Sequence, residues 1–171
     1  ISRTMAYHGS TITGASLGGM SGMHEQLYGA VPNIVHVMPP YAFELQEKGE
    51  SEHDFGLRAA RAIEIAILEA GPENVAAFIG EAIMGAGGVK IPPASYWPEV
   101  QRICKQYDIL LMLDEVITGY GRLGFAFAAE RYGVTPDMLT FAKGITNGAA
   151  PMGGVLVRDT IHDAFMSGPE H

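Results

Sequence analysis

The sequence predicts an α/β protein, a three-layer sandwich around a mostly parallel sheet. The first observation is that amphipathic helical segments alternate with short apolar runs along the chain. The second is that these runs are continuously apolar, which suits strands buried on both faces of a parallel sheet. The third is that several runs end at a charged residue, at the edge where open α/β sheets bind ligands. This combination favours an enzyme.

The composition is that of a folded domain with an acidic surface. A length of 171 residues, with 47% hydrophobic and 18% charged residues, supports a real core and excludes a disordered chain. The formal net charge of −8 argues against binding to nucleic acid or to an anionic membrane surface. Cys104 is the only cysteine, so a disulfide framework is excluded and a cytoplasmic protein is the simplest interpretation. No apolar run approaches the roughly 20 residues that span a bilayer.

The first half of the chain contains one strong helix. Residues 1–6 resemble the end of a strand, and the small-residue segment 14–20 is either a helix start or an irregular turn. Residues 28–49 carry three prolines and read as a surface loop with one short apolar piece. Apolar residues recur at three- and four-residue intervals over 52–70, which predicts a helix that Gly71 and Pro72 terminate.

The second half alternates strands and helices. Ser95 is expected to cap a helix that runs to about Tyr107, and a shorter helix is expected before the third of the strands. Residues 159–166 are expected to form the start of another helix. The predicted strands are 75–79, 109–113, 138–142 and 153–157.

Two of these strands run into residues that can carry chemistry. The strand 109–113 leads into Asp114, and the strand 138–142 leads into Lys143. A lysine amine is a nucleophile when it is deprotonated, although a solvated lysine at a strand end is the commoner outcome on local pattern alone. Consecutive side chains of an extended chain point in opposite directions. Glu115 is therefore expected to point away from Asp114, and Val116 to point the same way as Asp114.

The chain resembles the class III aminotransferases, or ω-transaminases, which are pyridoxal-phosphate enzymes of fold type I. The resemblance implies that the chain is part of the cofactor-binding large domain of such a transferase. It rests on four motifs: Asp114-Glu115-Val116, Gly119-Tyr120-Gly121-Arg122, Thr135-Pro136-Asp137 and Ala142-Lys143-Gly144.

The resemblance implies a role for each residue at this edge. Lys143 would form the Schiff base with pyridoxal 5'-phosphate, and Asp114 would bind the pyridine nitrogen, where an anion keeps the ring protonated and electron-withdrawing. Val116 would pack on one ring face and Tyr7 would stack on the other. His8 is expected near the site.

Glu81 follows the strand 75–79 and is also expected at the cofactor edge. It is followed by the glycine-rich loop Gly85–Gly88, as in the family. Ala82 stands where the family usually has proline, which leaves this turn less constrained. Glu81 is expected to balance the charge around Asp114 or the cofactor.

The implied reaction is transfer of an amino group from an ω-amino acid or amine to a keto acid. The segment 146–154 is most similar to transaminases that use pyruvate, with a terminal amine such as β-alanine or putrescine as donor. An aminomutase or a decarboxylase of the same cofactor family is an alternative. The resemblance also implies a homodimer, or a dimer of dimers, of the whole protein.

Two other motif matches point to a nucleotide-binding α/β protein. Gly119 to Gly124 fits the spacing GxGxxG, but a dinucleotide fingerprint follows a strand directly and opens a helix, and here 114–118 intervenes. The run 110–115 resembles a nucleotide hydrolase strand, yet the sequence has no GxxxxGK[ST] loop. No histidine pattern suggests a metal site.

Both ends suggest a larger protein. Residue 1 is isoleucine and residues 168–171 carry no evident closing element. We therefore expect residues 1–171 to be the central part of the cofactor-binding large domain. An N-terminal segment and a C-terminal small domain would lie outside it.

Overall fold

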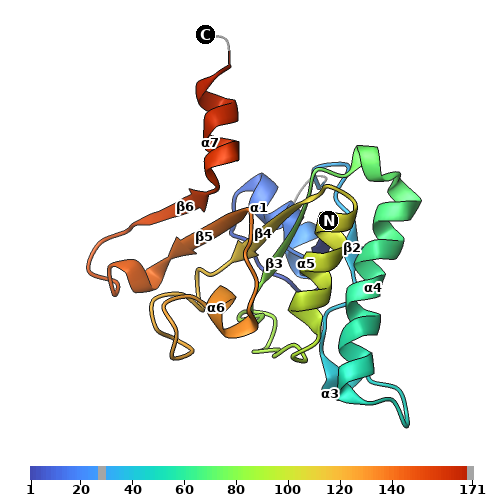
Figure 1. Cartoon of the computed structure of the whole chain (residues 1–171). Helices are drawn as coiled ribbons and strands as arrows, with labels where there is room; N and C mark the ends of the chain where they lie inside the picture. Colours follow the sequence, from blue (N-terminus) through green and yellow to red (C-terminus); the bar gives the residue numbers. More distant parts are fainter. Residues whose placement is uncertain (27–29, 169–171) are drawn as a thin grey trace.

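The computed structural model describes residues 1–26 and 30–168 (Figure 1). The start of the loop predicted from Tyr28 and the last three residues lie outside this range. The main sheet has the order β3-β4-β5-β6. Strands β3, β4 and β5 are parallel, and β6 pairs antiparallel with β5. The strands are β3 (Ala77–Glu81), β4 (Leu110–Asp114), β5 (Met138–Ala142) and β6 (Gly153–Val157). The mostly parallel sheet is confirmed.

A second, two-stranded parallel sheet extends the first one through Ile1. Strand β1 (Ser2–Arg3) pairs with β2 (His36–Val37). The Ile1 nitrogen donates a hydrogen bond to the carbonyl of Ala77 at 2.8 Å, and the Ile1 carbonyl accepts one from Ile79 at 3.0 Å. The strands therefore follow one another in the order β2-β1-β3-β4-β5-β6. From β1 the chain first forms β2 on one side of β1 and later β3 on the other side. Such a reversal of strand order is a topological switch point, where α/β sheets bind ligands.

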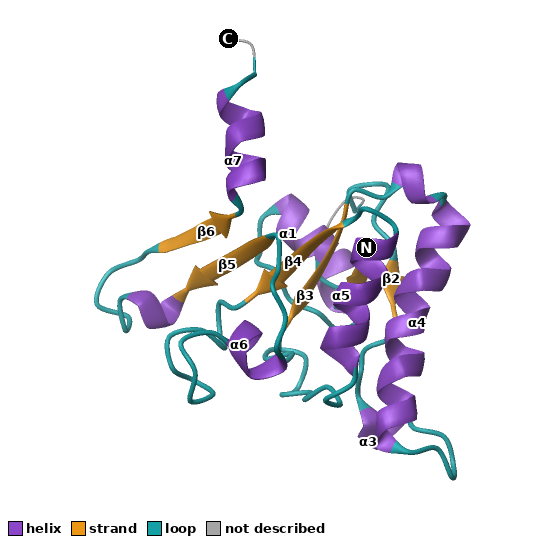
Figure 2. Cartoon of the chain, in the orientation of Figure 1, coloured by secondary structure: helices purple, strands orange, loops and turns teal. Residues whose placement is uncertain are grey.

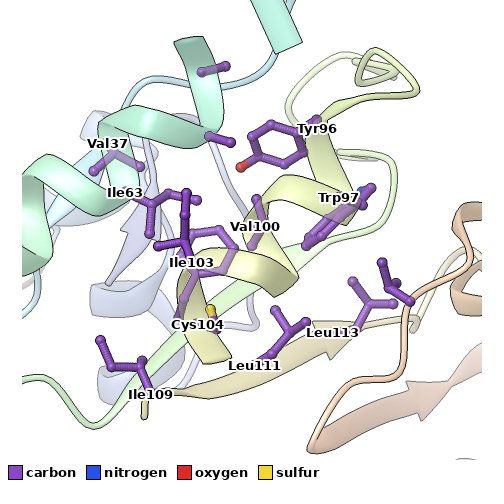
Figure 3. Packing of buried hydrophobic residues seen from close by; sticks show 14 of the residues in the cluster. Val37, Ile63, Tyr96, Trp97, Val100, Ile103, Cys104, Ile109, Leu111 and Leu113 are labelled. Atoms are coloured by element: carbon purple, nitrogen blue, oxygen red, sulfur yellow. The ribbon is translucent and has the colours of Figure 1, made fainter. Parts of the chain in front are cut away.

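One face of the sheet is covered by α4 (Glu52–Ala70) and α5 (Tyr96–Gln106) (Figure 2). The Ser51 hydroxyl caps α4 by accepting the N–H of Asp54 at 3.1 Å. Helix α5 packs on β4, and α4 packs on α5 and β2. Their buried apolar residues form one core with those of the strands, which Figure 3 shows closely packed. Its buried residues include Ile63, Trp97, Val100, Ile103, Leu111 and Leu113.

The opposite face carries α1 (Ile12–Leu17), followed along the chain by α2 (Ser21–His24). Leu17 of α1 lines the same cavity as Ile79 and Met112 of the sheet. The layers are thus helix, sheet and helix, as the sequence predicts. None of the described helices combines the length and apolarity needed to cross a membrane. The remaining helices are α3 (Ala42–Leu45), α6 (Ala128–Tyr132), α7 (Asp159–Met166) and the 3-10 turns Pro72–Asn74 and Lys143–Ile145.

Strand β3 lies two residues later than the strand predicted at 75–79. The prediction ended the strand at Gly80 and Glu81, which follow its apolar run. In the structure Gly80 is part of the strand, where it pairs with Leu113 of β4. A Cβ there would lie 3.0 Å from the Trp97 ring and 3.1 Å from the Arg3 guanidinium. The packing of these two large side chains requires glycine at this position.

Two further expectations were wrong. In the loop predicted at 28–49, the short apolar piece holds β2, which pairs with β1 through two backbone hydrogen bonds, but the pattern did not indicate the helix α3. The Ser95 hydroxyl does not cap α5. It donates to the carbonyl of His53 at 2.7 Å and so ties the start of α5 to α4.

Candidate active site

A cavity of about 480 Å³ lies at the carboxyl ends of β1, β3, β4 and β5. The structure brings all six sequence-predicted site residues to its wall: Tyr7, His8, Glu81, Asp114, Val116 and Lys143. The sequence reasoning missed its other lining residues: Gly9, Leu17, Ile79, Ile83, Met112, Ile117 and Thr140. Ile79 and Met112 stand two residues before Glu81 and Asp114, so the period of a strand could have identified them.

Asp114 is a buried carboxylate with two fixed partners. Its Oδ2 atom lies 2.8 Å from His8 Nδ1, and its Oδ1 atom accepts the backbone N–H of Val116 at 3.1 Å. Burial alone would raise the pKa of Asp114. The hydrogen bond and charge of His8, together with the Val116 N–H, outweigh burial and hold the pKa of Asp114 below its ordinary value. The group is therefore a permanent anion at neutral pH.

Because the pKa of Asp114 is lowered, the free energy of unfolding should depend on pH in the acidic range. The folded-state pKa lies below 3.8, so the ionised carboxylate stabilises the fold above about pH 4 and this contribution is lost as the pH falls through the folded-state pKa. We expect Asp114→Asn to lose less unfolding free energy than the wild type between about pH 5 and about pH 3, as measured by urea titration. Asp159→Asn, at an exposed position, should behave as the wild type. If the wild type and Asp114→Asn lost the same unfolding free energy, the ionised Asp114 carboxylate would not stabilise the fold, and the prediction would be wrong.

Glu81 uses both carboxylate oxygens to hold the backbone around the cavity. Oε1 accepts the N–H of Tyr7 at 3.1 Å and Oε2 accepts the N–H of Gly85 at 2.7 Å. The unusual Ala82 is buried, and its carbonyl accepts the Trp97 indole N–H at 2.9 Å. These three hydrogen bonds fix the turn that the family usually stiffens with proline.

Arg3 is a structural support that the sequence reasoning missed. Its side chain is fully buried, lies 5.5 Å from the centre of the Trp97 ring, and donates from Nη2 to the carbonyl of Glu81 at 2.7 Å. It therefore ties β1 to the carboxyl end of β3. An arginine inside the short strand predicted at 1–6 was the available signal, because buried arginines need specific acceptors.

Glu115 points away from the cavity, as the alternation of side chains predicts. It is fully buried, and Oε2 and Oε1 accept the N–H groups of Ala128 and Ala129 at 2.6 and 2.7 Å. The Thr118 hydroxyl adds a third hydrogen bond at 2.9 Å. The carboxylate caps the start of α6 and closes the loop 116–127.

Lys143 lines the cavity from the first residue of the turn after β5. Its φ is +46°, a left-handed conformation that few residues other than glycine adopt. Backbone strain of this kind persists only where the surrounding structure holds it, and it is concentrated at functional sites.

The glycine-rich stretch from Gly119 to Gly124 is not a dinucleotide-binding turn. It begins five residues beyond the end of β4 and leads through an irregular loop to the five-residue helix α6, which starts at Ala128. Backbone N–H groups at the start of a longer helix are what a pyrophosphate requires. The nucleotide-binding alternative therefore finds no support. Within 1–26 and 30–168 there is no cluster of three or more His, Cys, Asp or Glu side chains that could hold a metal ion.

A lysine and a buried carboxylate that share a cavity at the switch point of an α/β sheet define an enzyme of the α/β class. The chain belongs to the class-III aminotransferases, because the model of that family matches residues 1–171. This confirms the resemblance. Enzymes of this family depend on pyridoxal 5'-phosphate.

The similar proteins are transaminases. The chain is 51% identical to the putrescine–pyruvate aminotransferase of Pseudomonas aeruginosa over 171 residues, which cover 99% of this chain and 37% of that relative. It is 46% identical to gamma aminobutyrate transaminase 3 of Solanum lycopersicum, over 98% of this chain and 32% of the relative. The chain thus spans about a third of the length of these curated relatives. An aminomutase or a decarboxylase finds no support among them.

A solved structure shows the same fold. The (S)-enantioselective ω-transaminase of Thermomicrobium roseum superposes with a TM-score of 0.95 at 44% identity, over 99% of this chain and 38% of that one. Because the likeness extends along almost the whole chain, it confirms the fold class as the α/β sandwich of a pyridoxal-phosphate-dependent transaminase.

The residues of the cavity fit this cofactor chemically. The cavity offers apolar side chains to a flat ring and the anion Asp114 to a ring nitrogen. Two polar atoms in its wall, His8 Nε2 and Thr140 Oγ1, are buried without a hydrogen-bond partner among the described residues. Buried polar atoms of this kind need a partner, and a polar ligand in the cavity would supply one.

Proposed function

We propose that the protein carrying this chain is a transaminase that moves an amino group from an ω-amino acid or amine to a keto acid, with pyruvate as the favoured acceptor. The observation that carries the proposal is the convergence of Lys143, Asp114 and Tyr7 on one cavity from three distant segments. The named activity of the Pseudomonas aeruginosa relative supports putrescine and pyruvate as first substrates to test.

Residues 1–171 form, in this proposal, the central part of the cofactor-binding large domain. An N-terminal segment and a C-terminal small domain complete the subunit, and the whole protein is a homodimer or a dimer of dimers. The short coverage of the relatives supports the first point, because about two thirds of their length has no counterpart here. The family resemblance supports the homodimer or dimer of dimers.

Pyridoxal phosphate, when bound, withdraws electrons from the amine-bearing carbon of the donor so that this carbon can lose a proton. Lys143 would hold the cofactor through Nζ. The same Nζ, when free, would take the proton from the donor carbon as a general base. The amino group would pass in the end to the acceptor keto acid.

Asp114 and His8 serve the opposite end of the ring. The lowered pKa of Asp114 keeps its carboxylate ionised, so the carboxylate would hold a proton on the ring nitrogen of the bound cofactor. His8 Nδ1, 2.8 Å from Oδ2, orients the carboxylate. Val116 and Tyr7 line the cavity and would flank the two ring faces, and Glu81 holds the Tyr7 backbone in place.

The test is alanine formation by the whole protein. Incubation with putrescine and pyruvate should yield alanine in proportion to the putrescine consumed, measured by mass spectrometry. β-Alanine and γ-aminobutyrate in place of putrescine define the donor class. If no amine yields alanine, while the protein binds pyridoxal phosphate, the transaminase assignment is wrong.

A further inference from the structure

Tyr120 occupies an unusual place in the loop 116–127. Its backbone has a φ of +57°, in the left-handed region, although it is not a glycine. Its ring packs edge-on against Phe127 at 5.4 Å and against Phe141 of β5 at 6.0 Å between ring centroids. The residue therefore bridges the loop that follows Asp114 and the strand that leads to Lys143.

The backbone of the Lys143 turn rests on Tyr120. A Cβ built on Gly144 would lie 3.0 Å from Tyr120 Cβ and 3.4 Å from Tyr120 Cδ2. A side chain at 144 would thus have to displace Tyr120 or the turn. Glycine lets the two segments approach closely, immediately beside the strained Lys143.

The loop that carries Tyr120 is fixed at its base. The buried Glu115 binds the Thr118 hydroxyl at one end and the Ala128 and Ala129 N–H groups at the other. Such a loop can act as a rigid support for a neighbouring turn. Tyr120 lies between the anchored base of the loop and the Lys143 turn.

We propose that Tyr120 is a positioning residue for Lys143. It holds Lys143, the first residue of the turn Lys143–Ile145, in the left-handed conformation that directs its side chain into the cavity. The inference rests on the proposed function, in which Lys143 Nζ holds the cofactor and transfers the proton. Without the Tyr120 ring the turn relaxes toward an ordinary backbone conformation, and a misplacement of about 1 Å costs about 10²-fold in rate.

The first experiment compares three variants of the whole protein. Tyr120→Ala should lower kcat by about 10- to 100-fold, with a smaller change in KM, because a proton-transfer group is misplaced. Tyr120→Phe keeps the ring and should restore most of kcat. Phe125→Ala is the matched control, since Phe125 lies on the same loop, is exposed by the same 42%, and makes no aromatic contact among the described residues.

A second readout does not depend on turnover. Borohydride reduction of the protein loaded with pyridoxal phosphate, followed by peptide mass spectrometry, measures the rate and the site of cofactor attachment. Tyr120→Ala should attach the cofactor to Lys143 more slowly than the wild type does, while its melting temperature matches that of Phe125→Ala. Unchanged attachment and unchanged kcat in Tyr120→Ala would overturn the inference.

A double-mutant cycle isolates the contact with Gly144. Gly144→Ala alone should slow attachment, because its methyl group meets Tyr120. In a Tyr120→Gly background, which removes the obstructing Cβ and tolerates the positive φ, the same change should have a smaller effect. Equal effects in both backgrounds would refute the contact. If the wild type itself attaches no cofactor at Lys143, the proposed function is wrong. If only the Tyr120 and Gly144 variants behave unlike the expectation, the positioning role alone is wrong.

Discussion

Replacing Lys143 by alanine is expected to abolish the yellow absorption band of the bound cofactor and to lower amino transfer by about 10²–10⁴-fold, the usual contribution of a positioned general base. The reason is that Lys143 lies at the carboxyl end of β5 and lines the cavity shared with Asp114. Among the residues that the structure describes, no other lysine lines that cavity. The measurement is the visible spectrum of the whole protein, recorded before and after addition of putrescine and then of pyruvate.

A matched control lies away from the cavity, in the helix α5 that covers one face of the sheet. Lys105 is an exposed lysine in the last turn of α5. Lys105→Ala should keep a band that bleaches with the donor and returns with pyruvate. A Lys143→Ala protein that retains a band responsive to the donor would show that another amine holds the cofactor. The assignment of Lys143 would then be wrong.

Replacing Glu115 by alanine is expected to cost about 3–5 kcal/mol of unfolding free energy, because a buried group that loses its hydrogen-bond partner costs about 1–3 kcal/mol. The change leaves three groups without an acceptor: the N–H groups of Ala128 and Ala129 and the hydroxyl of Thr118. All lie in a fully buried environment around the carboxylate. Urea unfolding followed by circular dichroism measures the loss.

Glu130 provides the comparison for Glu115. It caps the same short helix from the solvent side, where Oε1 accepts the Phe127 N–H at 3.3 Å. Glu130→Ala should cost about 1 kcal/mol or less, in the range of an exposed cap. If Glu115→Ala and Glu130→Ala lost similar unfolding free energies, burial would add nothing to the Glu115 hydrogen bonds. The prediction of a large loss for Glu115→Ala would then be wrong.

Local periodicity predicted the parts of the fold that depend on local pattern. The helix 52–70 and the strand 153–157 have the bounds that the sequence indicates. The positions of Asp114 and Lys143 at one edge follow from a general property of parallel strands, whose carboxyl ends lie together. The opposite orientation of Glu115 follows from the strand period in the same way.

The remaining features depend on partners that are distant in the sequence. Gly80 belongs to a strand because it pairs with Leu113, and it is glycine because Trp97 and Arg3 pack against it; none of these contacts has a local signature. Strand β2 exists because β1 pairs with it. The support of the Lys143 turn by Tyr120 joins residues of two different loops. Sequence patterns report which residues are apolar and at what spacing, and they do not report which surfaces will meet.

The pairing of His8 with Asp114 joins residues that are 106 positions apart in the chain. Glu81 likewise binds the Tyr7 backbone across 74 positions, and Arg3 reaches the Glu81 carbonyl across 78. Contacts of such long range form late and slowly in folding, because a large loop must close before they give any stabilisation. During synthesis, His8 must therefore wait until Asp114, at the end of β4, has emerged from the ribosome. Acquisition of the cofactor should accordingly report the last stage of folding in this part of the protein.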